Sequence, residues 1–266
     1  MEHIIFKHVV NLGDLISVLP GIRHLYETTG KKAIIYQQLH RPGEYYIGAE
    51  HPTKDEKGNA VCFNQQCFDM MKPLLLAQDY IDGFEVYSGQ PVDYDLDVVR
   101  QQIYCGAPHF PLHKWTWMAY PEMWCDLSKS WLFGHNYAKY QDKVFINLTE
   151  RYRNYNINYF FLKKYEGKIW FIGTRKEHEL FCNAWNIEMP YFPVIDFLEL
   201  ASVIKSCKFF LGNQSFAWHL AQAMHVPRIL ELYPFAQNCT NFGANGYEFY
   251  HQPQLEYYVD KLFNEL

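Results

Sequence analysis

The chain has 266 residues, of which 49% are hydrophobic and 18% aromatic, enough for one large domain or two small ones. Its formal net charge is −5 and neither half is basic, which argues against non-specific DNA or RNA binding. No apolar run approaches the ~20 residues of a membrane span, and the start does not resemble a signal peptide. Seven cysteines without a C-x-x-C pair indicate reduced thiols. We therefore expect a cytoplasmic protein without a membrane span.

The first half is predicted to open with a strand–helix–strand unit. Residues 4–10 are apolar and β-branched, and the apolar residues of 15–26 recur at helical spacing. Pro20 either kinks this helix or starts it, and Gly30 ends it before a second strand at 33–36. In such a parallel unit, the turn at 11–14 lies on the carboxyl edge of the sheet.

The rest of the first half gives a weaker pattern. Residues 68–78 are predicted to form a helix and 84–87 a strand, whereas 40–60 has the polar, Gly- and Pro-rich composition of a loop. Residues 104–135 carry many aromatics, prolines and histidines without a clear period, so no structure is predicted for them.

From residue 141 the alternation is clearer. The predicted strands and helices are strands 144–148, 168–172, 209–211 and 228–232, and helices 158–165, 174–185, 198–206, 215–224 and 254–264. Thr174 with Glu177, and Asp196 with Glu199, have the spacing of capping boxes. Strands that alternate with helices predict parallel, doubly wound α/β sheets. We expect two Rossmann-like domains, 1–140 and 141–266, whose carboxyl edges face a shared cleft.

Two familiar phosphate motifs are absent from the sequence. No G-x-G-x-x-G follows a strand and no G-x-x-x-x-G-K-[ST] occurs, which disfavours ordinary dinucleotide redox chemistry and P-loop hydrolysis. His109 and His113 are four residues apart, but nearby prolines disfavour a shared helical face, and no carboxylate completes a ligand set. No metal site is expected.

One stretch of the second half is basic. Between 151 and 176, Glu166 alone opposes the cations, which are Arg151, Arg153, Lys163, Lys164, Lys168, Arg175 and Lys176. A solvated surface and a phosphate site both explain such a run, and both interpretations stay open.

The most informative segment follows the strand that ends at Gly212. A small polar turn leads into a helix, and the unpaired amides at a helix start can hold a phosphate. Asn213 or Ser215 is suited to capping this helix. His219 lies near its first turn, either as a ligand-binding residue or as an ordinary helix-surface histidine.

These residues carry a family resemblance. The turn Gly212-Asn-Gln-Ser215 with the following His219-Leu-Ala-Gln-Ala-Met resembles the donor-binding segment of the heptosyltransferase-like GT-B glycosyltransferases. The stretch Gly13-Asp14-Leu-Ile-Ser-Val-Leu-Pro is similar to the opening strand–turn–helix of that family. The resemblance covers roughly 4–30 and 144–234. The chain departs from the family pattern at Gln214, where the family usually has Asp, and at Phe216, where it has Gly.

The resemblance implies a GT-B-like architecture in which the N-terminal domain takes the acceptor and the C-terminal domain the nucleotide-sugar donor. It makes Asp14 the candidate base, although an Asp at this place could also cap the following helix. The implied donor- and phosphate-binding residues are Gly13, Thr149, Arg151, Arg153, Gly173, Arg175, Asn213, Gln214, Ser215, His219 and Glu231. Arg guanidinium groups and helix amides would stabilise the leaving group, so neither metal nor cofactor is expected besides the donor.

The expected function is transfer of a sugar from a nucleoside diphosphate sugar to a hydroxyl group of a glycan, a lipid-linked or another acceptor. Two alternatives stay open. A sugar-nucleotide epimerase of similar architecture would bind the same donor without an acceptor. A non-catalytic nucleotide- or sugar-binding protein would account for the missing acid at Gln214.

Overall fold

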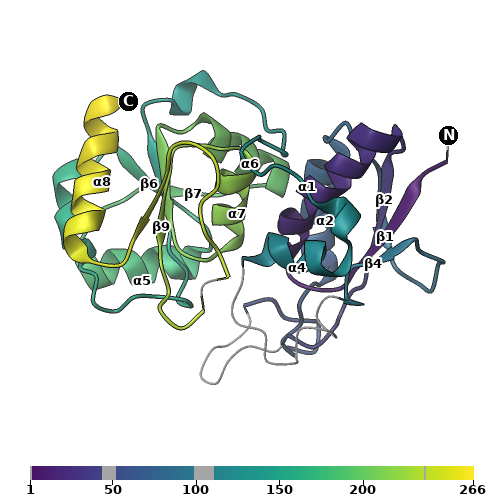
Figure 1. Cartoon of the computed structure of the whole chain (residues 1–266). Helices are drawn as coiled ribbons and strands as arrows, with labels where there is room; N and C mark the ends of the chain where they lie inside the picture. The colour runs from purple at the N-terminus through teal and green to yellow at the C-terminus, as the bar shows by residue number, and fades with distance from the viewer. Residues whose placement is uncertain (1, 44–51, 99–110, 237) are drawn as a thin grey trace. The chain divides into compact units, whose positions relative to one another are not determined.

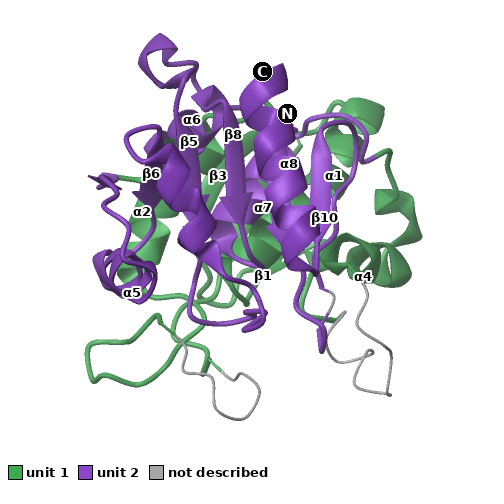
Figure 2. Cartoon of the chain, turned by 90° about the vertical axis from the view of Figure 1, so that its left-hand side faces the viewer, with its two compact units in different colours: residues 1–126, 196–198 green, residues 127–195, 199–266 purple. Residues whose placement is uncertain are grey.

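The computed structural model describes residues 2–43, 52–98, 111–236 and 238–266. They form two compact units, residues 1–126 with 196–198 and residues 127–195 with 199–266 (Figure 2). The chain therefore divides earlier than residue 140. The segment before 140 belongs to unit 2 because its backbone bonds there: the amide of Trp131 donates to Ala223 O at 2.9 Å and that of His135 to Ser202 Oγ at 3.0 Å.

Unit 1 is built on a four-stranded parallel sheet with the order β3-β2-β1-β4, of which β2, β1 and β4 are labelled in Figure 1. Its elements are β1 (Ile4–His8), α1 (Leu12–Thr29), β2 (Ala33–Gln37), α2 (Gln65–Leu76), β3 (Ile81–Val86), β4 (Tyr94–Asp95), α4 (Leu112–Ala119) and the 3-10 turn η1 (Pro121–Met123). The predicted strand–helix–strand opening is confirmed. Helix α4 and η1 lie in the stretch for which the sequence predicted no structure.

Helix α1 differs from its prediction in where it starts. It begins at Leu12 and runs through the buried Pro20 to Thr29, so Pro20 does not start it. Asn11 holds the N-cap position, and Gly13 and Asp14 lie in the first turn of the helix rather than in a loop. Gly30 ends the helix as predicted, because its left-handed backbone (φ 71°) lets its amide bond Tyr26 O at 2.8 Å.

Unit 2 contains a six-stranded, all-parallel sheet with the order β10-β9-β8-β5-β6-β7. Its strands are β5 (Val144–Asn147), β6 (Ile169–Ile172), β7 (Tyr191–Phe192), β8 (Phe209–Gly212), β9 (Arg228–Glu231) and β10 (Gly246–Phe249). Counted in chain order, this is the 3-2-1-4-5-6 order of dinucleotide-binding folds. The order reverses between β5 and β8, and ligands of such sheets bind beyond the carboxyl ends of the strands at that point.

The other elements of unit 2 are η2 (Ala138–Tyr140), η3 (Tyr159–Tyr165), α5 (Arg175–Trp185), α6 (Phe197–Ser206), α7 (Phe216–Ala223) and α8 (Gln252–Glu265). The segment predicted as helix 158–165 is a 3-10 helix. The predicted capping box of α5 is present: Thr174 Oγ1 accepts from Glu177 N at 3.2 Å, and Glu177 Oε2 accepts from Thr174 N at 3.1 Å. Near the start of α6, Glu199 Oε2 accepts from the amide of Ile195 at 2.7 Å.

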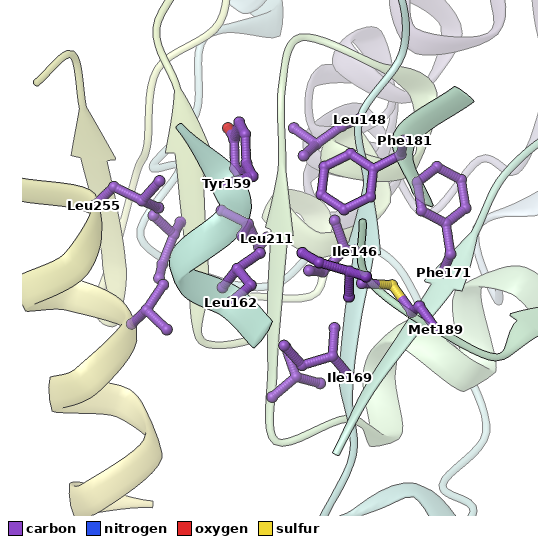
Figure 3. Packing of buried hydrophobic residues seen from close by; sticks show 14 of the residues in the cluster. Ile146, Leu148, Tyr159, Leu162, Ile169, Phe171, Phe181, Met189, Leu211 and Leu255 are labelled. Carbon is purple, nitrogen blue, oxygen red and sulfur yellow. The ribbon is translucent and has the colours of Figure 1, made fainter. Parts of the chain in front are cut away.

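The core of unit 2 explains its apolar strands. Ile146 of β5 lies in one apolar cluster with Phe181 of α5, Leu255 of α8 and Tyr159 of η3 (Figure 3). Val144, two residues earlier on the same strand, belongs to the same cluster. The intervening Phe145 is also fully buried. Strands covered on both faces need apolar residues throughout, which is why the sequence shows continuous runs there. No helix in the described ranges is long and apolar enough to cross a membrane.

Candidate functional site

The carboxyl end of β5 and that of β8 are joined by the side chain of Asn213, which is fully buried. Its Oδ1 accepts from the amide of Thr149 at 3.1 Å, and its Nδ2 donates to the carbonyl of Arg151 at 2.6 Å and that of Tyr152 at 3.4 Å. Asn213 thus fixes the loop after β5 beside the start of α7. This is the position at which the strand order reverses.

The backbone of Tyr152 is held in the left-handed region, with φ 53°. A non-glycine residue pays for this conformation in steric strain, and such strain persists where surrounding bonds enforce it. Here the bonds from Asn213 to the carbonyls of Arg151 and Tyr152 enforce it. The turn directs the chain from Arg151 to Arg153, the two residues that the sequence assigned to phosphate.

Glu231, at the end of β9, is part of a buried ion pair. Both of its carboxylate oxygens lie 3.2 Å from Arg153 Nε, and they also accept from the Tyr159 hydroxyl and the Asn154 amide. The residue is fully buried, whereas the family resemblance implied that it binds the donor. The geometry gives Glu231 a structural role, which is to hold the loop after β5 and η3 against β9.

This cluster shifts the pKa values of its members. Burial alone would lower the pKa of Arg153, but the charge of Glu231 and the neighbouring Tyr159 outweigh it and the pKa is raised. Burial, and then the charge of Glu231, raise the pKa of Tyr159 well above its ordinary value. Arg153 is therefore a permanent cation. Its guanidinium bonds Glu231 through Nε and also interacts with the hydroxyl and the ring of Tyr159.

The start of α7 follows the pattern predicted for it. Ser215 is the N-cap, and its Oγ accepts from Trp218 N at 3.3 Å. Gln214, at the position where the resembled family usually has an acid, is buried, and its Oε1 has no hydrogen-bond partner within the described part of the chain. A buried amide oxygen without a partner costs free energy. A ligand that donates a hydrogen bond at this helix start would relieve that cost.

His219 is not a helix-surface residue, since it is only 5% exposed. Its Nε2 lies 3.5 Å from Cys239 Sγ, and its ring contacts the Trp218 ring edge to face at 5.1 Å. His219 is a residue of α7, and this packing places its ring in the interior of unit 2.

Gly173 and Arg175 follow β6. Gly173 has φ 153°, and a Cβ there would lie 2.4 Å from Asn147 Nδ2, an atom that donates to Ile172 O at 2.8 Å. Arg175 is exposed and its guanidinium carbon lies 4.6 Å from the centre of the Tyr191 ring. Glycine is required here for close packing of the two strand ends, while Arg175 remains accessible beside them.

Replacement of Gly173 by alanine is expected to lower the free energy of unfolding by about 2–3 kcal/mol, since both the backbone conformation and the contact with Asn147 are unfavourable. Gly167→Ala is the control, because Gly167 also has a positive φ (82°) but nothing within 4 Å of the added Cβ. Urea denaturation measures both. Equal losses in the two variants would show that the close approach to Asn147 carries no cost.

In unit 1, the strand ends carry a different set of polar residues. Asp14 is half-buried in the first turn of α1, and the carbonyl of Gly13 accepts from Ser17 Oγ at 2.9 Å. A buried pair that the sequence did not reveal lies at the ends of β1 and β2, where His8 Nδ1 is 2.7 Å from Gln37 Oε1. Both apolar strands end in a polar residue, and this pattern could have revealed the pair.

Two other titratable residues of unit 1 lie on elements other than α1. His113 is buried on α4, and Glu122 is exposed in η1. His109 lies outside the described residues. Within the described residues no group of three His, Cys, Asp or Glu side chains is arranged to hold a metal ion.

An open hollow of about 860 Å³ is lined by Ile4, Tyr94 and Glu122, among others. The hollow borders the starts of β1 and β4, whereas Asp14 follows the end of β1.

The chain has two Rossmann-like units, and in the second unit polar loops lie where the strand order of the sheet reverses. These features define it as a protein of the GT-B fold class. Its structure is similar to those of heptosyltransferases. With E. coli heptosyltransferase WaaC solved with ADP, the TM-score is 0.62 at 10% identity, over 98% of this chain and 100% of that one. With E. coli ADP-heptose lps heptosyltransferase II it is 0.57 at 12% identity, over 99% of each.

A glycosyl transferase of family 9 from Veillonella parvula is similar as well, with a TM-score of 0.53 at 12% identity over 100% of this chain and 90% of that chain. No protein-family profile matches the sequence, and no curated protein has a matching sequence. The chain therefore has the heptosyltransferase fold, as the resemblance implied, with little sequence in common.

Proposed function

We propose that this protein is a glycosyltransferase that moves a sugar from a nucleoside diphosphate sugar to an acceptor hydroxyl. The observation that carries the proposal is the set of hydrogen bonds made by the Asn213 side chain. They fix the loop of Thr149, Arg151 and Arg153 beside the start of α7. Cations and helix amides that converge on one place suit a diphosphate. The fold shared with heptosyltransferases supports the same reading.

In the proposed reaction, the acceptor oxygen attacks the anomeric carbon of the donor. The bond from that carbon to the phosphate oxygen breaks, and the electron pair leaves with the nucleoside diphosphate. Arg151, Arg153 and the α7 amides would stabilise the negative charge on the leaving group. Asp14 would take the proton from the acceptor hydroxyl.

Asn213 and Glu231 support this site rather than contact the donor. The side chain of Asn213 is used by the loop after β5, and that of Glu231 by Arg153, Asn154 and Tyr159. Thr149, Gly173, Arg175, Gln214 and Ser215 remain proposed donor-side residues. His219 would act through packing below the helix start.

The test is a thermal-shift screen followed by product analysis. ADP sugars come first in the panel, because solved relatives carry ADP or an ADP-heptose compound. A ligand at a hundredfold excess over its Kd stabilises by ~2.7 kcal/mol. Transfer gives free nucleoside diphosphate and a new glycoside. An altered donor sugar without transfer would instead indicate an epimerase.

A non-catalytic binding protein is the second candidate, and Gln214 favours it. The amide stands where the resembled family usually carries an acid, and it is buried. Such a protein would bind the donor and release neither nucleoside diphosphate nor glycoside with any acceptor.

Replacement of Arg151 or Arg153 by alanine is expected to weaken nucleotide-sugar binding by ~1.5–3 kcal/mol, the value of a lost charged hydrogen bond. Lys176→Ala is the control, since Lys176 belongs to the same basic run but its side chain is 74% exposed and pairs with Glu150. Calorimetry measures all three variants. Because Arg153 also supports the fold, Arg151→Ala is the decisive variant. Unchanged affinity in that variant would show that the basic run is a solvated surface and not a phosphate site.

A further inference from the structure

Three aromatic rings meet beside the loop after β5 and the loop after β9. The ring centres of Tyr152 and Tyr233 lie 5.4 Å apart, and those of Tyr233 and Phe235 lie 5.6 Å apart. Phe235 is 75% exposed, so a large apolar ring faces solvent. We call Tyr152, Tyr233 and Phe235 the aromatic cluster.

The cluster is fixed to the candidate phosphate site through two connections. Tyr152 lies between Arg151 and Arg153, and Asn213 holds its carbonyl in the strained left-handed turn. Arg153 pairs with Glu231, which ends β9 two residues before Tyr233. A group bound at the cluster would therefore lie close to a diphosphate held by Arg153 and the start of α7.

The ring arrangement decides which kind of group fits. The Tyr152 and Tyr233 rings are inclined by 71°, and the Tyr233 and Phe235 rings by 69°. A flat nucleobase stacks face to face on aromatic rings, whereas the neighbouring rings of this cluster are inclined and do not sandwich a flat group. Inclined rings with two phenol hydroxyls instead offer apolar faces for the C–H side of a sugar and hydrogen-bonding groups for its hydroxyls.

We propose that the aromatic cluster is the subsite for the sugar ring of the nucleotide-sugar donor. The inference rests on the proposed function, because it takes the phosphate position from it. It adds that part of the donor specificity comes from the loops after β5 and β9.

The experiment compares each nucleotide sugar with its own nucleoside diphosphate. Calorimetry is run with ADP-glucose and ADP, UDP-glucose and UDP, and GDP-mannose and GDP, on the wild type, Phe235→Ala and Tyr233→Phe. Tyr257→Ala is the matched control, since Tyr257 is 63% exposed and its ring also contacts a tyrosine, Tyr258, on α8. Thermal melting confirms that all variants fold.

For the sugar that the wild type binds, Phe235→Ala is expected to lose about tenfold in affinity, the size of one aromatic contact. The affinity for the nucleoside diphosphate and the behaviour of Tyr257→Ala should stay unchanged. Tyr233→Phe should lower only the nucleotide-sugar affinity, through the lost hydroxyl. Equal losses for nucleotide sugar and nucleoside diphosphate would place the base at the cluster and overturn the proposal.

Two further outcomes separate this inference from the proposed function. If the wild type binds nucleotide sugars and Phe235→Ala binds them as tightly, the cluster proposal is wrong while the proposed function stands. If calorimetry detects no binding of any of the six compounds to the wild type, the donor assignment itself fails, and the sugar subsite fails with it.

Discussion

Replacing Glu231 by glutamine is expected to lower the free energy of unfolding of unit 2 by about 3–5 kcal/mol, the usual cost of breaking a buried ion pair. The carboxylate accepts from Arg153, Asn154 and Tyr159. A glutamine side chain offers a single acceptor oxygen and turns an NH₂ group toward the remaining donors. It also leaves Arg153, whose side chain is only 16% exposed, without its counter-charge.

Urea denaturation measures this loss, and hydrogen exchange at the β9 amides assigns it to unit 2. Glu150→Gln is the matched control. Glu150 pairs with Lys176 at 3.1 Å, but the two side chains are 56% and 74% exposed, so its loss should cost less than ~1 kcal/mol. If Glu231→Gln costs no more than Glu150→Gln, the buried cluster does not hold the strand ends together.

The parts of the fold that the sequence predicted well are those with two local signals in agreement. Strand β6 is a continuous apolar run that ends at Ile172, and Gly173 and the capping residues Thr174 and Glu177 follow it. The parallel core strands β5, β8 and β9 have the same apolar character because both faces are covered. Strands β4, β7 and β10 were missed, and β4 and β7 have only two residues each, which give no period to detect.

The start of α1 was misplaced for a local reason. Asn11-Leu-Gly-Asp14 reads as a turn, because Asn, Gly and Asp all favour turns. In the structure only Asn11 lies outside the helix, at its N-cap position. Gly13 and Asp14 belong to the first helical turn. Pro20 is buried inside the helix, where packing of the surrounding apolar residues outweighs the lost backbone hydrogen bond.

The candidate site shows a second limit, which is distance along the chain. Glu231 meets Arg153 from 78 residues away and Tyr159 from 72. One sequence without an alignment contains no signal for such pairs, so an acid at a strand end was assigned to a ligand. The contacts of Tyr152 with Tyr233 are hidden in the same way. Residue types at strand ends indicated the candidate site, while the partners of each residue came from the fold.

Asp14→Asn is expected to slow sugar transfer at least a hundredfold while leaving donor affinity and thermal stability close to wild type. A base contributes to the transition state, typically ~10²–10⁴-fold in rate, and asparagine cannot accept the proton. The geometry also allows a structural role, since Asp14 lies in the first turn of α1 behind the cap position of Asn11. An acid there adds about 0.3–1 kcal/mol to stability through the helix dipole.

The two roles of Asp14 are separated by measuring transfer rate, donor Kd and melting temperature on the same preparations. Asp69→Asn is the control, because Asp69 is an exposed acid on a helix of the same unit, α2, and accepts a hydrogen bond from Gln65 at 2.8 Å. It should match the wild type in all three measurements. A slow Asp14→Asn with normal donor binding identifies the base and makes the protein an enzyme. Near-normal transfer by that variant would contradict the assignment and direct the search to Glu122, exposed in η1, and to His113 on α4.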